Sequence, residues 1–292
     1  MASEPVKETA GTLYVVATPI GNLDDLTSRG VKCLKEVDLI ACEDTRRTAR
    51  LLNHLGIRKP LISCFEHNEL ARVEELLGKL DRGADIALVS DAGTPTISDP
   101  GFALVRAAHE RGIRVSPLPG PSALLATLSV SGLPTDEFLF AGFLPRTASA
   151  RRTRLEGLKT HTATLIFYEA PHRVVHSLAD MIAVLGDRRA FLGREVTKLH
   201  EELQSGTLSS IARSLGARAE VLGEIVLVVA GAEAGAHKSG SLDDALVRFD
   251  AEVAMGATPR QAAKEAASAT GLAARDVYAR AASRGVKLGP RG

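Results

Sequence analysis

The sequence predicts an α/β protein with two α/β domains followed by a small helical module. Short apolar runs rich in β-branched residues alternate with amphipathic segments from residue 12 to about residue 230. This alternation is typical of parallel sheets covered by helices. Beyond residue 240 the chain carries helix-capping signals but no further apolar run of that kind. With 292 residues, the chain is long enough for two domains and an appendage.

The stretch SDAGTPTISDPG at 90–101 is the central feature of the first domain, 12–131. It follows the apolar run 86–89 and precedes a periodic segment, so it lies at the carboxyl end of a predicted buried strand. Open α/β sheets bind ligands at such ends. Gly93 permits close backbone approach, and Pro95 stiffens the loop. An ordinary Gly-Pro turn explains so long a loop poorly. The loop also supplies short polar groups, at Asp91, Thr94, Ser98 and Asp99.

The other predicted strands of the first domain also end in loops that can face a ligand. The strand at 12–17 runs into TPIGNL, and the strand at 114–118 runs into PGPSA. Pro117 marks the latter as an edge strand because proline cannot donate to a ladder. Ser122 is expected to cap the next helix. No GxGxxG follows any predicted strand, so the dinucleotide fingerprint is absent. Further strands are predicted at 38–42 and 61–64, and a helix at 69–80.

The strand at 38–42 ends in the charged run Glu43-Asp44-Thr45-Arg46-Arg47. One interpretation is a helix start capped by Asp44 or Thr45. The other is a substrate-facing group of acid, hydroxyl and guanidinium. The two interpretations are compatible, and both place this run at the same edge as the 90–101 loop.

A second α/β domain is predicted at 136–235, after a linker around 131–135. Strands are expected at 138–143, 164–168, 191–198 and 224–231, with a helix from about 172 to 185. The segment 144–160 has a net charge of +4 in a nearly neutral protein, which favours a phosphate-binding strip over a merely solvated face. Its basic residues are Arg146, Arg151, Arg152, Arg154 and Lys159.

The region 240–292 is expected to form three short helices after a linker at 231–240. Ser241 and Asp244 form a capping-box pattern, Thr258-Pro259 is a helix start, and Gly271 is a stop. With a net charge of +3 over 238–292, this module looks like a helix-turn-helix unit. A three-helix packing appendage remains an open alternative. The N-terminal residues 1–11 are polar, lack a signal core and are expected to be disordered.

Composition excludes several classes of protein. The net charge of +1 argues against a wholly basic nucleic-acid binder, so such a role must rest on local patches. The three cysteines have no CxxC spacing, which predicts reduced thiols, a cytoplasmic location and no metal site. No stretch approaches the ~20 apolar residues of a membrane span. The cysteines are Cys33, Cys42 and Cys64.

The motifs resemble the tetrapyrrole-methylase superfamily of S-adenosylmethionine-dependent methyltransferases. Within it they are similar to the subgroup that methylates the ribose 2′-oxygen of a cytidine in small-subunit (16S) ribosomal RNA. The C-terminal helices are also similar to that subgroup's extension. The motifs span nearly the whole catalytic region in the family's order: VVATPIGNLDD at 15–25, CEDTR at 42–46, SDAGTPTISDPG at 90–101, LPGPSA at 118–123, FYEAPHR at 167–173, GREVTK at 193–198 and EIVLVVAG at 224–231.

The resemblance implies two α/β domains with S-adenosylmethionine in the cleft between them, a homodimer, and small-subunit ribosomal RNA or the 30S particle as the partner. By the same resemblance, Thr94-Pro95 occupies the place of the family's Asp-Pro cofactor loop. The predicted cofactor-binding residues are Pro19, Asp91, Gly93, Thr94, Pro95, Ile97, Ser98, Ser122, Ala123 and Tyr168.

The predicted reaction moves a methyl group from a sulfonium to a ribose oxygen, which is mainly a positioning task and needs no metal. A base must accept the hydroxyl proton, and three carboxyls at predicted strand exits are candidates among which the sequence does not choose: Asp44, Glu169 and Glu195. Basic residues are predicted to hold phosphates of the RNA. They are Arg46, Arg146, Arg151, Arg152, Arg173, Arg194 and Lys198.

Three other functions remain open from the sequence. The chain can be a tetrapyrrole C-methyltransferase, but the +4 strip and the helical tail favour RNA. It can be a non-enzymatic nucleic-acid-binding regulator acting through the tail, but a regulator has no use for the dense strand-end loops. It can also methylate a protein, as a diphthamide-pathway relative does.

Overall fold

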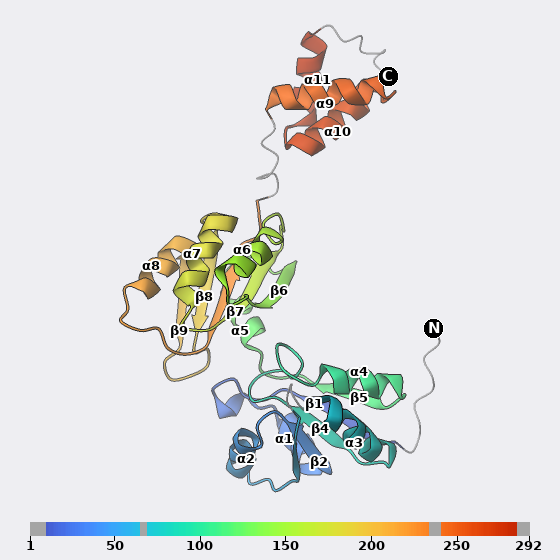
Figure 1. Ribbon diagram of the computed structural model, residues 1–292, viewed down its shortest axis with the longest axis vertical. Coiled ribbons are helices and arrows are strands. Elements are labelled where there is room, and N and C mark those ends of the chain that lie inside the picture. The colour runs from blue at the N-terminus through green and yellow to red at the C-terminus, as the bar shows by residue number, and fades with distance from the viewer. Residues whose placement is uncertain (1–9, 65–68, 234–240, 285–292) are drawn as a thin grey trace. The chain divides into compact units, whose positions relative to one another are not determined.

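The computed structural model describes residues 10–64, 69–233 and 241–284, and these divide into two compact units (Figure 1). The first unit comprises residues up to 156 together with 164–230, and the second comprises 157–163 together with the chain from 231 onward. Both predicted α/β regions therefore belong to the first unit. The prediction of disorder at 1–11 and the predicted linker at 231–240 fall largely outside the described residues.

The first half of the first unit is a five-stranded sheet in the order β3-β2-β4-β1-β5, and all of its pairings are parallel. The predicted strands are confirmed, and β5 lies at the edge where Pro117 placed it. The elements are β1 (Thr12–Val16), η1 (Leu23–Asp25), α1 (Ser28–Glu36), β2 (Leu39–Cys42), α2 (Thr45–His54), β3 (Leu61–Ser63), α3 (Glu69–Asp81), β4 (Ile86–Val89), α4 (Phe102–Glu110), β5 (Arg114–Leu118) and α5 (Ala123–Val130).

Helices cover both faces of this sheet. Leu34 of α1 and Leu52 of α2 pack in one buried cluster, and Leu76 of α3 and Leu104 of α4 pack in another. β2 and β4 are buried along their whole length because both faces are covered, which explains their continuous apolar sequences. All strands point the same way, so their carboxyl ends meet at one edge.

The second half is a five-stranded sheet in the order β6-β7-β10-β8-β9, and it is mixed rather than parallel. β10 runs antiparallel to both β7 and β8. The prediction missed β9 and α8, because the strand ELQSGT is polar and half-exposed and has no apolar run. The elements are β6 (Phe138–Phe143), α6 (Ala148–Glu156), β7 (Thr164–Glu169), α7 (Val174–Leu185), β8 (Arg189–Arg194), β9 (Glu202–Thr207), α8 (Leu208–Gly216) and β10 (Ile225–Val229).

α5 joins the two halves by packing on the second sheet. Leu124 and Leu128 of α5 share a buried cluster with Ile166 of β7 and Val228 of β10. This helix begins directly after the PGPSA loop of the first sheet, so it fixes that loop against the face of the second sheet. Ser122 is the N-cap residue, but its side chain accepts no capping hydrogen bond, so the predicted capping contact is wrong.

The described residues of the second unit form three helices with their own core. Phe249 of α9 (Leu242–Ala254), Ala263 of α10 (Pro259–Thr270) and Val277 of α11 (Ala274–Ser283) lie together in a buried cluster. The predicted caps are confirmed, since Ser241 and Asp244 form a reciprocal capping box and Gly271 ends α10 in the left-handed conformation. Helix capping thus defined this module without any strand signal.

Candidate functional site

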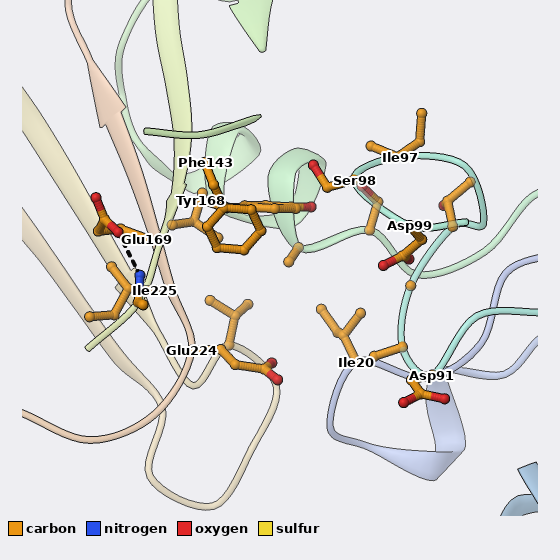
Figure 2. Close-up of a pocket in the computed structure, with 18 of the residues that line it drawn as sticks. Ile20, Asp91, Ile97, Ser98, Asp99, Phe143, Tyr168, Glu169, Glu224 and Ile225 are labelled. Atoms are coloured by element: carbon orange, nitrogen blue, oxygen red, sulfur yellow. Dashed lines mark hydrogen bonds between the residues drawn. The ribbon is translucent and has the colours of Figure 1, made fainter. Parts of the chain in front are cut away.

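A cavity of about 510 Å³ opens at the carboxyl edge of the first sheet, and residues of both sheets line it (Figure 2). Its size falls within the usual range of small-molecule sites. One wall is the 90–101 loop, with Ile97, Ser98 and Asp99. The opposite wall carries Phe143 and Tyr168, at the ends of β6 and β7. The site therefore lies where the sequence predicted a ligand site, at the ends of β4 and β7.

Three loops of the first sheet are tied to the 90–101 loop. Thr18 and Gly93 exchange two backbone hydrogen bonds, with N···O distances of 2.8 and 3.0 Å. The Thr94 hydroxyl donates to the Pro121 carbonyl at 3.2 Å, and the Asp44 amide donates to the Asp91 carboxylate at 3.0 Å. These bonds join the loops after β1, β2, β4 and β5 into one rigid frame at the cavity.

Backbone strain is concentrated in the loops around the cavity. Among the described residues, the non-glycine positions with positive φ are Thr96, Ser98, Glu195 and Thr197. Two belong to the 90–101 loop and two to the loop after β8. A threonine with φ of 73° is rare because its branched Cβ crowds the backbone. Such strain persists only where surrounding contacts hold it, and it is typical of functional sites.

Asp99 is a cavity carboxyl that the sequence did not single out as a base. Burial, together with the nearby carboxylates of Glu43, Asp91 and Glu224, raises its pKa to about 6 against a hydrogen bond from Ser90 that lowers it. These neighbours come from the loop after β2, the end of β4 and the entry to β10. A carboxyl that ionises near pH 6 can accept a proton at neutral pH.

Glu169 is 2% exposed and lines the cavity at the end of β7. Its Oε1 accepts from the Ala170 amide at 2.8 Å and also from the Arg173 guanidinium. Its Oε2 is buried and has no protein partner. A buried carboxylate oxygen of this kind is costly unless a hydrogen bond is donated to it. Figure 2 shows the Glu169 carboxylate pointing away from the space between the two walls, so this oxygen does not face the cavity.

The other two predicted bases lie outside the residues that line the cavity. Asp44 caps α2, and hydrogen bonds from Arg46 lower its pKa to about 2. Burial of Glu195 opposes its ionisation, but hydrogen bonds from Lys198 and the Glu224 amide outweigh burial and lower its pKa. Both carboxylates are held in their ionised form by structural partners, which makes them weak proton acceptors.

Most of the predicted cofactor residues do line the cavity, and they come from the loops after β4 and β5 and the end of β7. Pro19 and Pro95 are not among the lining residues. The predicted residues in the lining are Asp91, Gly93, Thr94, Ile97, Ser98, Ser122, Ala123 and Tyr168. Sequence reasoning missed Ile20, Glu43, Arg47, Phe143, Val196, Glu224, Ile225 and Val226. The signal for Arg47 was present in the CEDTRR run, whereas the entry to β10 carried none.

Most of the arginines predicted to hold RNA phosphates have protein partners. Arg151 corrects the prediction most clearly, since its side chain is 6% exposed and its Nε donates to Asp180 at 2.7 Å. Arg173 pairs with Glu169, Arg194 with Glu202, and Lys198 with Glu195. Three predicted residues lie at the surface: Arg46 and Arg152, each with an acidic neighbour, and Arg146.

Two features are absent from the described residues. No cluster of three or more metal-ligating side chains occurs among them. None of their helices is long and apolar enough to cross a membrane.

The comparisons with known proteins cover most of the chain. The family model described as Tetrapyrrole (Corrin/Porphyrin) Methylases matches residues 12–212. The chain is 48% identical over 280 residues to ribosomal RNA small subunit methyltransferase I of Pseudomonas aeruginosa, covering 94% of this chain and 98% of that protein. It is 47% identical to the protein of that name from Mesorhizobium japonicum, covering 94% and 93%.

Solved structures with the same fold are more distant in sequence. A diphthine synthase superposes with a TM-score of 0.56 at 15% identity, covering 75% of this chain and 90% of that one. Uroporphyrin-III-C-methyltransferase from Thermus thermophilus superposes with a TM-score of 0.53 at 19% identity, covering 75% and 94%. At such identities the likeness concerns the fold alone.

Proposed function

Because this chain belongs to the family of tetrapyrrole (corrin/porphyrin) methylases, we propose that it transfers a methyl group from S-adenosylmethionine to small-subunit ribosomal RNA. The acceptor is the ribose 2′-oxygen of a cytidine. The observation that carries this proposal is the near-full-length match to proteins named ribosomal RNA small subunit methyltransferase I. The uroporphyrin and diphthine enzymes share only the fold and cover 75% of the chain.

The cavity fits S-adenosylmethionine in its chemistry. The carboxylates of Asp91, Asp99 and Glu224 suit a cationic sulfonium. Gly93, with φ of 80°, brings backbone to the cavity wall without a Cβ. The bound cofactor supplies an electrophilic methyl group.

The protein contributes alignment and a proton acceptor. We assign the acceptor role to Asp99, because it lines the cavity and its pKa of about 6 leaves it ionised at neutral pH. Glu169 is instead paired with Arg173, and its buried carboxylate points away from the cavity. Asp44 and Glu195 act as structural anchors of α2 and of the loop after β8.

The substrate state and the assembly are part of the same proposal. The chain acts in the cytoplasm on small-subunit RNA or the 30S particle, and it does so as a homodimer. The buried free thiols Cys33, Cys42 and Cys64 suit a reducing compartment. Exposed Arg46, Arg146 and Arg152 supply phosphate contacts. Light scattering at assay concentrations tests the dimer, and a monomer of full activity would contradict it.

A methyl-transfer assay with labelled S-adenosylmethionine tests the function. The protein is offered 30S subunits, free small-subunit RNA, a porphyrinogen and a translation factor in parallel. We expect label in the RNA, recovered as 2′-O-methylcytidine after digestion to nucleosides. Label in the porphyrinogen or the protein instead would assign the chain to another branch of the family. If no methyl group were transferred to any of these acceptors, the chain would act as a non-enzymatic binding protein.

A further inference from the structure

Phe143 is an exposed aromatic residue held in place at the mouth of the cavity. It is 53% exposed, although it lies at the end of β6 and lines the site (Figure 2). Its ring packs edge-on against Tyr168, with centroids 5.6 Å apart and an interplanar angle of 62°. The Tyr168 ring also packs edge-on against Phe140 at 4.9 Å. The chain has only eleven Phe and Tyr residues and no Trp, so two aromatic rings in the cavity lining, with a third packed against one of them, are a marked concentration.

A β-bulge places Phe143 on this wall. In a regular strand, residues three apart point to opposite faces. Phe140 and Phe143 nevertheless both contact Tyr168, because the register of β6 against β7 shifts between Phe140 and Gly142. Gly142 has φ of 66°, the left-handed conformation that such bulges use. Without the extra residue, the Phe143 ring would face away from the cavity.

The opposite wall approaches the strand at the same point. A Cβ at Gly142 would lie 3.7 Å from the Ser98 hydroxyl oxygen, so the 90–101 loop lies against β6 there. Ile97 of that loop is 39% exposed and also lines the cavity. The half-exposed ring of Phe143 and the exposed side chain of Ile97 therefore both border the cavity. Their apolar surfaces contact water until a ligand covers them.

We infer that Phe143 is a stacking surface for a nucleobase of the RNA substrate, an inference that rests on the proposed function. Enzymes that modify single-stranded RNA commonly splay a base out and stack it on an aromatic side chain. The exposed Arg146 follows three residues later, beyond the end of the strand. An exposed aromatic ring and an exposed arginine close by in the sequence are residue types that bind single-stranded nucleic acid by stacking and phosphate contact.

The substrate base is a better occupant than the cofactor's adenine because of where the ring lies. The partly buried Asp99 carboxylate and the buried backbone of Gly93 line the cavity, and these suit an enclosed cofactor. Of the two rings that line the cavity, Phe143 is more exposed to solvent than Tyr168. The strand that carries Phe143, β6, is followed directly by the basic segment 144–160. A base stacked there would be continuous with RNA running over that segment.

The test compares Phe143→Ala and Phe143→Tyr with Phe138→Ala in full-length protein. Phe138 is a matched control, since it lies on the same strand and is 43% exposed but does not line the cavity. We expect Phe143→Ala to weaken binding of 30S subunits or small-subunit RNA about 5-fold to 150-fold. Phe143→Tyr keeps most of the affinity, and Phe138→Ala leaves it unchanged. The S-adenosylmethionine affinity, measured by calorimetry, changes less than about twofold in every variant.

A second measurement uses the absence of tryptophan from the chain. Phe143→Trp and Phe138→Trp each create a protein with one tryptophan, and oligocytidylate is titrated into both. We expect the indole fluorescence of Phe143→Trp to be quenched by stacking, while that of Phe138→Trp stays constant. Quenching by S-adenosylmethionine alone, or loss of cofactor affinity in Phe143→Ala, would assign the ring to adenine and overturn the inference.

Two other results would also overturn it. RNA affinity unchanged in Phe143→Ala excludes stacking on the substrate. A shift of the protein to smaller assemblies in Phe143→Ala, at unchanged RNA affinity per protomer, would make the ring a contact between copies of the chain. Failure of the proposed function is separate, because it would appear in the wild-type protein as RNA binding without methyl transfer.

Discussion

The two sheets contribute to the same cavity in different ways. The first is entirely parallel, so the loops after β1, β2, β4 and β5 all reach one edge and bind each other through backbone groups. The second is mixed, so the same edge receives the carboxyl ends of β6 and β7 but the amino end of β10. The first sheet supplies rigid backbone and carboxyls, while the second supplies the aromatic rings of Phe143 and Tyr168 and the carboxylate of Glu224.

This difference teaches that strand direction decides how a site is built. Parallel strands end in loops at the same edge of a sheet. Hydrogen bonds between four such loops can hold their backbone groups in the geometry that one type of ligand needs. A mixed sheet presents alternate strand ends and entries, so single side chains such as Phe143 and Glu224 reach the cavity. We therefore assign the cofactor mainly to the first sheet and the substrate base to the second.

Replacing Asp99 is expected to have the largest effect and tests the chemical role of the first sheet. Asp99→Asn removes the proton acceptor, so kcat should fall about 100-fold to 10 000-fold while cofactor affinity is largely kept. Steady-state methyl transfer and calorimetry measure the two quantities. Glu224→Gln is the control, because Glu224 lines the same cavity but pairs with Lys198. Equal losses in both variants would mean that cavity charge, not Asp99, matters.

The pH dependence sharpens the assignment of Asp99. Because burial raises its pKa to about 6, kcat/KM should rise with pH through that value as the carboxylate forms. The same shift works against stability: between about pH 4 and pH 6 the folded state holds a proton that the unfolded chain has lost, so stability falls as pH rises. Asp99→Asn should therefore raise the melting temperature at pH 7 but not at pH 3. No such gain would contradict the raised pKa.

Arg151 tests whether the arginines of the second half are structural. Its side chain and that of Asp180 are 6% and 5% exposed, and removing Arg151 leaves the buried Asp180 carboxylate with Arg152 as its remaining partner. Arg151→Ala should lower the free energy of unfolding by about 1–3 kcal/mol, measured by urea denaturation. Exposed Arg154→Ala should change it by less than about 0.5 kcal/mol. If Arg151→Ala kept full stability and lost RNA affinity, Arg151 would be an RNA contact, as the sequence predicted, and not a structural residue.

The helical module tests whether substrate contacts extend beyond the cavity. A truncation ending at Gly235 removes α9–α11, which have their own buried core. Cofactor affinity should be kept, because the described cavity residues all lie between Ile20 and Val226. Activity on 30S subunits should fall, with a higher KM. Full activity after truncation would assign the module to packing, and loss of cofactor binding would make it a support of the catalytic unit.

The smallest expected effect concerns the exposed part of the basic strip. Arg146→Ala and Arg154→Ala should each weaken RNA binding modestly and reduce the slope of log affinity against log salt by about one. Filter binding between low and moderate salt measures the slope. If the slope of log affinity against log salt were unchanged in both variants, this segment would be a solvated surface that does not contact the RNA.

The sequence predicted the first sheet well because its signals are local. Each buried strand is a short apolar run, each functional loop follows it directly, and Pro117 even marked the edge strand. The predicted family and fold class are confirmed by the comparisons. The second sheet was predicted less completely. Periodicity identifies a strand but not its direction, so the entry to β10 was missed while the exits of β7 and β8 were found.

Two other misses have specific physical causes. The bulge at Gly142 changes which face Phe143 occupies, and a one-residue register shift cannot be read from an apolar run. The net charge of 144–160 does not show which of its basic side chains pair with acidic residues elsewhere in the chain. Asp180 lies on α7, distant in sequence, and it removes Arg151 from the surface and engages Arg152. Local pattern therefore located the site but did not decide which charges face it.

The division of labour between the two sheets is tested most directly by measuring cofactor and RNA affinities in Gly93→Val and Phe143→Ala side by side. Gly93 has φ of 80°, which a β-branched residue tolerates poorly, and Gly56→Val, at φ of 67° and remote from the cavity, controls for backbone strain. We expect Gly93→Val to lose S-adenosylmethionine affinity and keep RNA affinity, and Phe143→Ala to do the reverse. Loss of both affinities in either variant, or of the same one in both, would contradict separate roles for the two sheets.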